Sequence, residues 1–202
     1  MRRAQAAVFA AFLAMGMVRA APSLEWPMVY DDLHLIRPYT TEEIVASWHG
    51  NWDPDGIETP GFRPVSLLFN HARARLCGES VVAHRLLIIV LYAAFVALLV
   101  PVAARFGAGP ATVLLAGALM LAARYEVYGY VWITDGNHML QGLAFAGGAI
   151  LLLDGLDRGD YVRLALSLAC LKGGLLVRED TLAIVPVVLL LALADLRRWR
   201  RH

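Results

Sequence analysis

The chain has 202 residues, of which 59% are hydrophobic, and its formal net charge at pH 7 is +1. Soluble domains are usually about 45–50% apolar, and the excess here is concentrated in long runs, so the composition predicts an integral membrane protein. No basic stripe with interleaved aromatic residues is present, so we expect no nucleic-acid partner. The two cysteines, Cys77 and Cys170, are too few for a disulfide framework and are interpreted as small apolar fillers.

Six apolar runs predict an all-α, polytopic transmembrane protein with about six spans. The runs are Ala4–Val18, Leu86–Ala104, Ala108–Ala123, Met139–Leu153, Val162–Val177 and Leu182–Leu196. Several are shorter than the roughly 20 residues that cross about 30 Å of hydrocarbon, and we expect flanking Tyr, Trp, His and Arg side chains to extend them at the interface. The first run also fits a cleavable signal peptide. We favour an uncleaved helix because the polar segment after it needs an anchor.

Arginines at both ends of the chain predict its orientation. Arg2 and Arg3 precede the first run, and four more arginines follow the sixth run between residues 197 and 201. Six spans put both ends on one side, and the positive-inside rule makes that side cytoplasmic. We therefore expect a protein of the plasma (inner) membrane in which residues 21–83 form a large first extracytoplasmic loop.

This outer loop is expected to contain amphipathic surface helices. Thr40-x-x-Glu43 is a capping-box pattern and predicts a short helix as far as Trp48. Residues 51–62 are rich in Gly, Pro and Asp and predict a loop. Apolar residues recur at helical spacing over residues 65–76, which predicts an amphipathic helix lying on the membrane lipids.

Several arginines of the outer loop conflict with the positive-inside rule. Arg73, Arg75 and Arg85 all lie near the second predicted span, on the side where the rule disfavours them. Either the long loop is exempt or these arginines have a function. For Arg73 and Arg75 we expect contacts with lipid headgroups.

A series of short motifs follows one order along the chain. They are Tyr30-Asp31-Asp32-x-x-x-Ile36, Gly61-Phe62-Arg63-Pro64-Val65-Ser66, Cys77-Gly78, His84, Val131-Trp132-Ile133, Val177-Arg178-Glu179-Asp180 and Pro186. In this order and placement they resemble the polyprenyl-phosphate-sugar-dependent glycosyltransferases of the C superfamily, especially the protein O-mannosyltransferase-like and aminoarabinose-transferase-like members. The resemblance covers about Trp26 to Leu191. It implies transfer of a monosaccharide from a lipid-linked donor to an acceptor on the extracytoplasmic face, with inversion.

The sequence departs from the family pattern in three ways. The acid that members often carry four residues before the tryptophan of the second outer loop is here Tyr128, and Glu126 stands two residues earlier. The usual lysine of the basic-acidic pair is Arg178. Family members also have about twice as many helices. Residues 1–202 are therefore expected to be a single transmembrane glycosyltransferase-like domain, the N-terminal portion only, that needs a missing C-terminal half or a partner subunit.

Asp31 and Asp32 are the candidate catalytic residues. They lie just beyond the first predicted span, where a carboxylate can accept a proton from an acceptor hydroxyl while the donor stays in lipid. A base must come within about 2.6–3.2 Å of that hydroxyl. The resemblance implies that Asp31 is the base and that Asp32 positions it or helps to bind sugar or metal. The alternative is that two solvated acids cap a turn.

Five further residues are candidates for substrate binding. Arg63 and Arg178 suit the lipid phosphate, because a guanidinium grips phosphate bidentately, and Glu179 could hold Arg178 in place. Glu126 could complete an acidic site opposite Asp31. Lys172 lies six residues inside Arg178, and a charge within a membrane is by default a functional candidate. The alternatives are headgroup contacts for the basic residues, an ion pair at a helix end, and ordinary solvated acids.

Metal ligands are not assigned. Five of the six histidines are considered as ligands and show no metal-ligand spacing, and Asp31-Asp32-x-His34 is a weak pattern. The sequence predicts no certain cofactor and leaves a divalent metal open. The histidines concerned are His34, His49, His71, His84 and His138.

Two other functions compete with the enzyme. The first is a non-catalytic truncated paralogue or fragment that acts as a membrane partner protein. The second is a transporter or lipid-binding membrane protein. Transport sites lie near the middle of the membrane, whereas the polar residues here gather at the outer surface, with Lys172 as the exception. The transporter is therefore the less favoured of the two.

Overall fold

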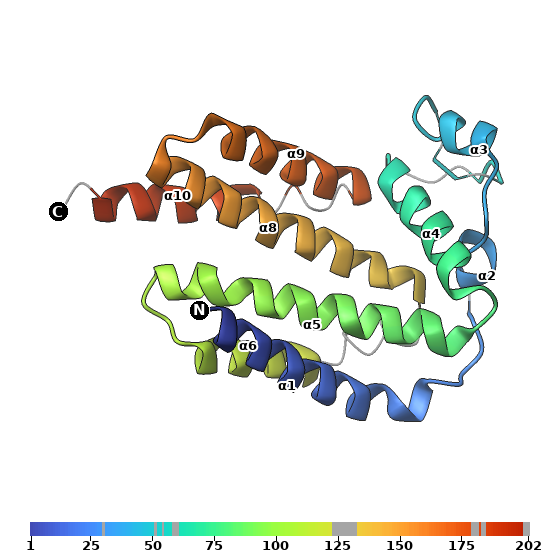
Figure 1. Ribbon diagram of the computed structural model, residues 1–202. Helices are drawn as coiled ribbons and strands as arrows, with labels where there is room; N and C mark the ends of the chain where they lie inside the picture. The colour runs from blue at the N-terminus through green and yellow to red at the C-terminus, as the bar shows by residue number, and fades with distance from the viewer. Residues whose placement is uncertain are drawn as a thin grey trace.

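The computed structural model describes residues 1–29, 31–50, 52–53, 55–57, 61–122, 133–178, 182 and 185–199. Within these ranges every regular element is helical, which confirms the all-α fold class (Figure 1).

Each of the six apolar runs forms a helix. These helices are α1 (Arg2–Ala20), α5 (Val81–Arg105), α6 (Pro110–Ala122), α8 (Asn137–Arg158), α9 (Tyr161–Val177) and α10 (Val185–Trp199). Among the described residues, three segments are long and apolar enough to cross a membrane, namely Arg2–Ser23, Val81–Arg105 and Asn137–Arg158. At 1.5 Å per residue, α6 extends about 20 Å, which is less than the roughly 30 Å of hydrocarbon. The structure therefore supports three spans, and the other three stay a prediction.

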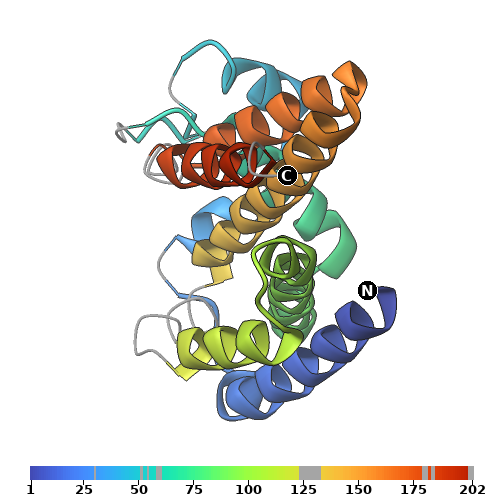
Figure 2. The same ribbon diagram turned by 90° about the vertical axis from the view of Figure 1, so that its left-hand side faces the viewer.

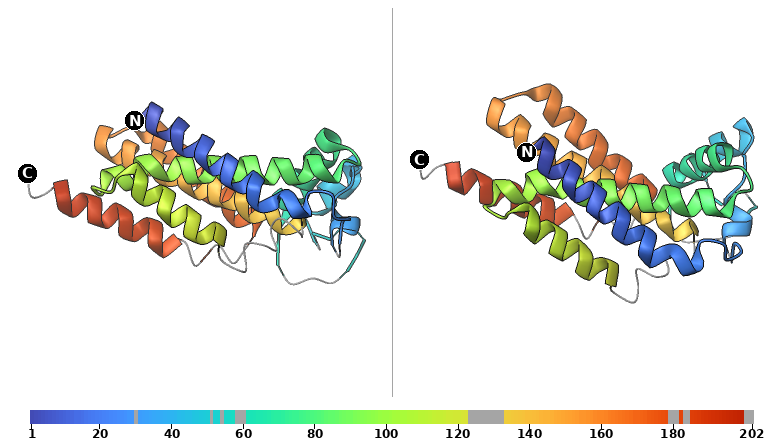
Figure 3. Two further views of the ribbon diagram at one scale, coloured as in Figure 1. Left: turned by 90° about the horizontal axis from the view of Figure 1, so that it is seen from below. Right: turned by 60° about the horizontal axis from the view of Figure 1, so that its bottom comes forward.

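The long helices pack around α5. This helix contacts α1 and α6 on one side and α8 on the other, and α8 in turn contacts α9 and α10 (Figure 2). Successive long helices run in alternating directions along the bundle (Figure 3). The N-terminal end of α1 and the C-terminal end of α10 consequently lie at the same end of the molecule (Figures 1 and 3).

Small residues allow α1, α5 and α6 to approach closely. The Phe12 and Tyr92 rings meet edge to face, with centroids 5.1 Å apart. Gly117 of α6 lies against this pair, since a Cβ atom there would be 2.6 Å from Phe12 Cε2 and 3.0 Å from Val96 Cγ1. Between apolar helices in lipid, such close packing replaces the hydrophobic effect as the source of association.

A tight hairpin joins α8 to α9. Gly159 ends α8 with φ 60°, a left-handed conformation that glycine adopts without strain. Asp160 then caps α9 by accepting hydrogen bonds from the backbone N–H groups of Val162 and Arg163. Further along, Ser167 Oγ donates to the Gly148 carbonyl at 2.7 Å. This bond ties the two helices together where small residues face each other.

The outer loop folds as a cap on the far end of the bundle. Its helices α2 (Asp32–Leu35), α3 (Thr41–Ala46) and α4 (Pro64–Cys77) lie at the end opposite the chain termini (Figure 1). The predicted capping box is confirmed, because Thr40 N donates to Glu43 Oε2 at 2.7 Å and Glu43 N donates to Thr40 Oγ1 at 3.2 Å. Helix α3 ends at Ala46, two residues earlier than predicted.

Helix α4 has the predicted apolar stripe, and the stripe points away from the protein. Leu68 and Leu76 are 37% and 75% exposed, while Asn70 and Arg73 on the other side are buried. This orientation suits a helix lying on lipid. Two short 3₁₀ segments, η1 (Ala21–Ser23) and η2 (Ile133–Gly136), complete the described elements that surround the cap.

Candidate functional site

Asp32 is a fully buried carboxylate that connects the segment after α1 to η2. Its Oδ1 atom accepts hydrogen bonds from Thr134 N and Thr134 Oγ1, both at 2.6 Å. Its Oδ2 atom accepts from Ile133 N at 3.1 Å and from Val29 N at 3.3 Å. The side chain is 0% exposed and its oxygens already hold four donors. Of the roles considered for Asp32, positioning its neighbour is the one that this geometry supports.

Two arginines beside Asp32 are buried as well. Arg73 donates from Nη1 to the Ile133 carbonyl and from Nη2 to Asn70 Oδ1, each at 2.9 Å. Arg85 donates from Nη1 to the Leu24 carbonyl at 2.9 Å. Burial lowers the pKa of Arg73 to about 10, against the opposing effect of Asp32, so the guanidinium stays charged at neutral pH.

The expected headgroup contact of Arg73 is therefore wrong. Its side chain is 1% exposed, because the buried Asp32 carboxylate requires a buried counter-charge. Arg85, at 0% exposure, is likewise part of the protein interior. The conflict of these two arginines with the positive-inside rule is explained by structural hydrogen bonds. Arg75 is exposed, so a headgroup contact for it stays a prediction.

Asp31 has the opposite environment. It precedes α2 and is exposed, and its side chain makes no capping bond to the helix. No described residue offers this carboxylate a hydrogen bond or an ion pair. A carboxylate held at a helix start but not engaged by the protein is available to a ligand.

Arg63 and Arg178 are carried by segments that meet. Arg63 stands just before α4 and Arg178 just after α9, and Ser66 Oγ donates to the Val177 carbonyl at 2.6 Å. Arg178 is held further by Gln141, whose Nε2 donates to the Arg178 carbonyl at 3.4 Å. The Arg63 guanidinium lies over the Trp52 ring, 5.5 Å from its centroid. Both arginines are half-buried.

The acid pair and these arginines lie toward different ends of α4. Asp32 is near Arg73, and ten residues separate Arg73 from Arg63, or about 15 Å at 1.5 Å per residue. The structure therefore brings Arg63 and Arg178 to one region and leaves Asp31 beyond it. A ligand that contacted all three would have to extend along α4.

Of the remaining candidates, Lys172 is exposed on α9, about 9 Å along the helix from Arg178, and does not join this region. The other two candidates, Glu126 and Glu179, lie outside the described residues.

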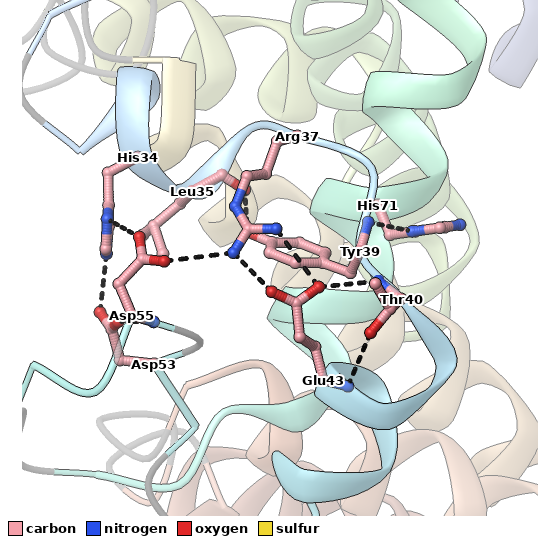
Figure 4. A network of polar contacts seen from close by, with 9 residues as sticks. All are labelled: His34, Leu35, Arg37, Tyr39, Thr40, Glu43, Asp53, Asp55 and His71. Carbon is pink, nitrogen blue, oxygen red and sulfur yellow. Dashed lines mark hydrogen bonds and ion pairs between the residues drawn. The ribbon is translucent and has the colours of Figure 1, made fainter.

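A cluster missed by the sequence analysis lies one helical turn from Asp31. His34 Nε2 contacts Asp53 Oδ2 at 2.9 Å, and His34 Nδ1 contacts Asp55 Oδ2 at 2.6 Å (Figure 4). The histidines show no ligand spacing among themselves, and the acids next to His34 in the sequence are not its partners, which are carboxylates about twenty residues away. The pair Asp53-x-Asp55, following His34 in the same loop, is the signal that could have found it.

A network of charges connects this cluster to α3. Arg37 Nη2 contacts Glu43 Oε1 at 2.7 Å and Asp55 Oδ1 at 3.2 Å, and its guanidinium lies 4.5 Å from the Tyr39 ring centroid (Figure 4). The hydrogen bond from Arg37 lowers the pKa of Glu43. The carboxylate of Glu43 is thus kept ionised well below neutral pH.

No protein-family model matches the chain, and no curated protein or solved structure matches it either. The arguments for a function therefore come from the motifs and from the geometry above.

Proposed function

We propose that this protein is a membrane glycosyltransferase that moves a monosaccharide from a polyprenyl-phosphate donor to an acceptor hydroxyl on the extracytoplasmic face. One observation carries the proposal. Of two adjacent aspartates, Asp32 is locked by four hydrogen bonds while Asp31 is exposed and has no partner among the described residues. A general base needs this combination of fixed position and free lone pairs.

In the proposed reaction Asp31 is the general base. The acceptor hydroxyl attacks the anomeric carbon, its proton passes to the Asp31 carboxylate, and the bond from that carbon to the phosphate oxygen breaks. The polyprenyl phosphate leaves as a stable anion, so the leaving group needs no general acid. A single displacement of this kind inverts the anomeric configuration.

Arg63 and Arg178 are proposed to hold the donor phosphate. The Ser66–Val177 hydrogen bond joins their segments, and a guanidinium offers paired N–H donors that match phosphate oxygens. The separation along α4 requires a donor whose sugar extends from the arginines toward Asp31. Part of this path is expected to come from the predicted missing half or a partner subunit.

The orientation is also a proposal. We place the cap of α2, α3 and α4 outside the plasma membrane and both termini in the cytoplasm. The arginines at both ends of the chain and the position of the cap opposite both ends of the bundle support this (Figure 3).

The experiment is a transfer assay with the full chain in membranes and a set of polyprenyl-phosphate sugars. Asp31→Asn keeps the side-chain shape but cannot take up a proton, so transfer should fall by about 10²–10⁴-fold. Glu79→Gln, at an exposed acid of the same outer segment, is the matched control and should keep normal activity. Near-normal transfer in Asp31→Asn would mean that another residue is the general base. A folded wild-type chain that uses no donor, even when the proposed missing half or partner subunit is supplied, would favour the non-catalytic membrane partner.

A further inference from the structure

His34, Asp53 and Asp55 bring three potential metal ligands together in the cap. One imidazole nitrogen and one oxygen from each carboxylate all lie within 4.8 Å of one another. The Asp53 side chain is 3% exposed, that of His34 is 22% exposed and that of Asp55 is 47% exposed. The cluster is thus buried on one side and open to solvent on the other.

The two contacts of His34 cannot both be satisfied by a neutral imidazole. A neutral ring carries one N–H group, so it can donate to one carboxylate only. Its other nitrogen would then present a lone pair to a carboxylate oxygen at 2.9 or 2.6 Å, which is repulsive. A doubly protonated ring satisfies both contacts, and so does a metal ion bound at one nitrogen while the N–H group of the other nitrogen donates to its carboxylate.

The charges around the ring favour a cation larger than a proton. Asp53, Asp55 and Glu43 contribute three negative charges to the network, and the guanidinium of Arg37 contributes one positive charge (Figure 4). Acidic side chains thus outnumber basic ones among these contacts, and one of the carboxylates is almost fully buried. A divalent cation at this place would offset more of the negative charge than one proton on His34 does.

We propose that His34, Asp53 and Asp55 bind a divalent transition-metal ion, with Zn²⁺ the best fit. Imidazole nitrogen with carboxylate oxygens is a usual zinc donor set, while Mg²⁺ and Ca²⁺ prefer oxygen ligands alone. Ligand atoms about 2.1 Å from a tetrahedral zinc ion lie about 3.4 Å from one another. The three ligand atoms here lie within 4.8 Å, and one carboxylate must turn toward the ring nitrogen that the other contacts to complete the site. Three protein ligands leave a fourth position for water.

The ion would connect the loop around Asp53 and Asp55 to α2. Because α2 has only four residues, such a link would fix its orientation and, with it, the position of Asp31 one turn away. This metal site does not depend on the proposed function, because the ion would fix the orientation of α2 whatever the role of Asp31 is.

The test is zinc binding to the full chain in detergent micelles, purified with a tag that contains no histidine and stripped with a chelator. Titration with zinc chloride should give one bound ion per chain by calorimetry, and the fluorescence of Trp52, next to Asp53, should change with the same stoichiometry. His34→Ala and Asp55→Asn should each weaken binding by about tenfold or more. His49→Ala, at an exposed histidine of the same loop, is the control and should bind normally.

The possible outcomes separate the two cations. Loss of zinc binding in both variants, with an unchanged oligomeric state and helix content, supports the metal site. Because Asp55 is exposed, Asp55→Asn should not unfold the protein, so its loss of binding would report on the site itself. Absence of stoichiometric binding, or equal binding in wild type and His34→Ala, overturns the proposal. So does a nitrogen-15 spectrum in which the His34 ring stays doubly protonated with zinc present at neutral pH, because the second cation is then a proton only. None of these results depends on sugar transfer.

Discussion

Asp31 and Asp32 are neighbours in the chain and yet meet entirely different surroundings. Successive residues of a helix point about 100° apart, so the short helix α2 directs one carboxylate to the interior and the other to solvent. The interior side chain has two arginines nearby, Arg73 and Arg85. Asp32 is therefore placed to stabilise the fold, and Asp31 is placed to meet a ligand.

This division makes opposite predictions for the two side chains. Asp32→Ala removes the acceptor of four hydrogen bonds and a negative charge that acts on the buried Arg73 and Arg85, and should lower the free energy of unfolding by about 3–5 kcal/mol. Asp31→Asn, at the exposed position, should change it by no more than about 0.5 kcal/mol. Thermal unfolding in detergent, followed by circular dichroism, measures both. Equal losses of unfolding free energy in Asp32→Ala and Asp31→Asn would contradict the assignment of the structural role to Asp32 alone.

Arg63→Ala and Arg178→Ala should raise the KM for the lipid donor more than they reduce kcat. The reason is that arginine grips a phosphate in the ground state as well as in the transition state, and loss of such uniform binding acts on KM. Arg75→Ala, at an exposed arginine of α4, is the control. An unchanged KM in both variants would reject the phosphate site.

Local side-chain interactions were predictable at this scale and distant ones were not. The capping box of Thr40 and Glu43 was found because its members are three residues apart and one pattern describes them. The partners of Asp32 lie about a hundred residues away, at Ile133 and Thr134. No single-sequence pattern connects such positions, and for this reason Arg73 was wrongly assigned to lipid.

The long helices were the most predictable elements. Each apolar run became a helix, since a run of apolar residues is a strong signal and hydrogen bonding within a helix satisfies the backbone in lipid. How the helices pack depends on which small residues face a partner, and hydropathy does not show this. Gly117 is one such position, and Gly147 on α8 is a glycine with open space around it.

Gly117→Ala should destabilise the protein by about 1–3 kcal/mol, because the new methyl group overlaps Phe12 and one of the helices must shift. Gly147→Ala adds the same methyl group where nothing lies within 4 Å. There the better helix propensity of alanine should leave stability unchanged or raise it by up to about 1 kcal/mol. Resistance to thermal unfolding in a fixed detergent compares the pair. If Gly147→Ala lost as much stability as Gly117→Ala, close packing at Gly117 would not be the cause of the loss.

Over the whole molecule, the cap and the two chain ends lie at opposite ends of the bundle (Figure 1). The all-α class and the order of the helices followed from the sequence. The number of spans did not, because three of the helices are shorter than the membrane and their role depends on flanking residues and neighbouring helices.

The proposed orientation can be tested by labelling single cysteines in intact cells with a reagent that does not cross membranes. In a background of Cys77→Ala and Cys170→Ala, Ile57→Cys in the outward-facing segment Asn51–Pro60 should be labelled, since Ile57 is 53% exposed. His202→Cys, in the cytoplasmic segment Arg197–His202, should react only after the cells are opened. Labelling of His202→Cys from outside would reject both the topology and a reaction on the outer face.

The hydrogen bonds of Asp32 have a consequence for the time course of biosynthesis. Thr134 is made 102 residues after Asp32, which at about 5–20 residues per second is a delay of roughly 5–20 s. Arg85 likewise reaches the Leu24 carbonyl only after 61 further residues have been added. During this interval the nascent outer loop holds a carboxylate that has not yet met its partners. The cap therefore assumes its final arrangement late, once Ile133 and Thr134 have been made and have reached Asp32, and a ribosome stalled before Thr134 would present α2 in an unfinished state.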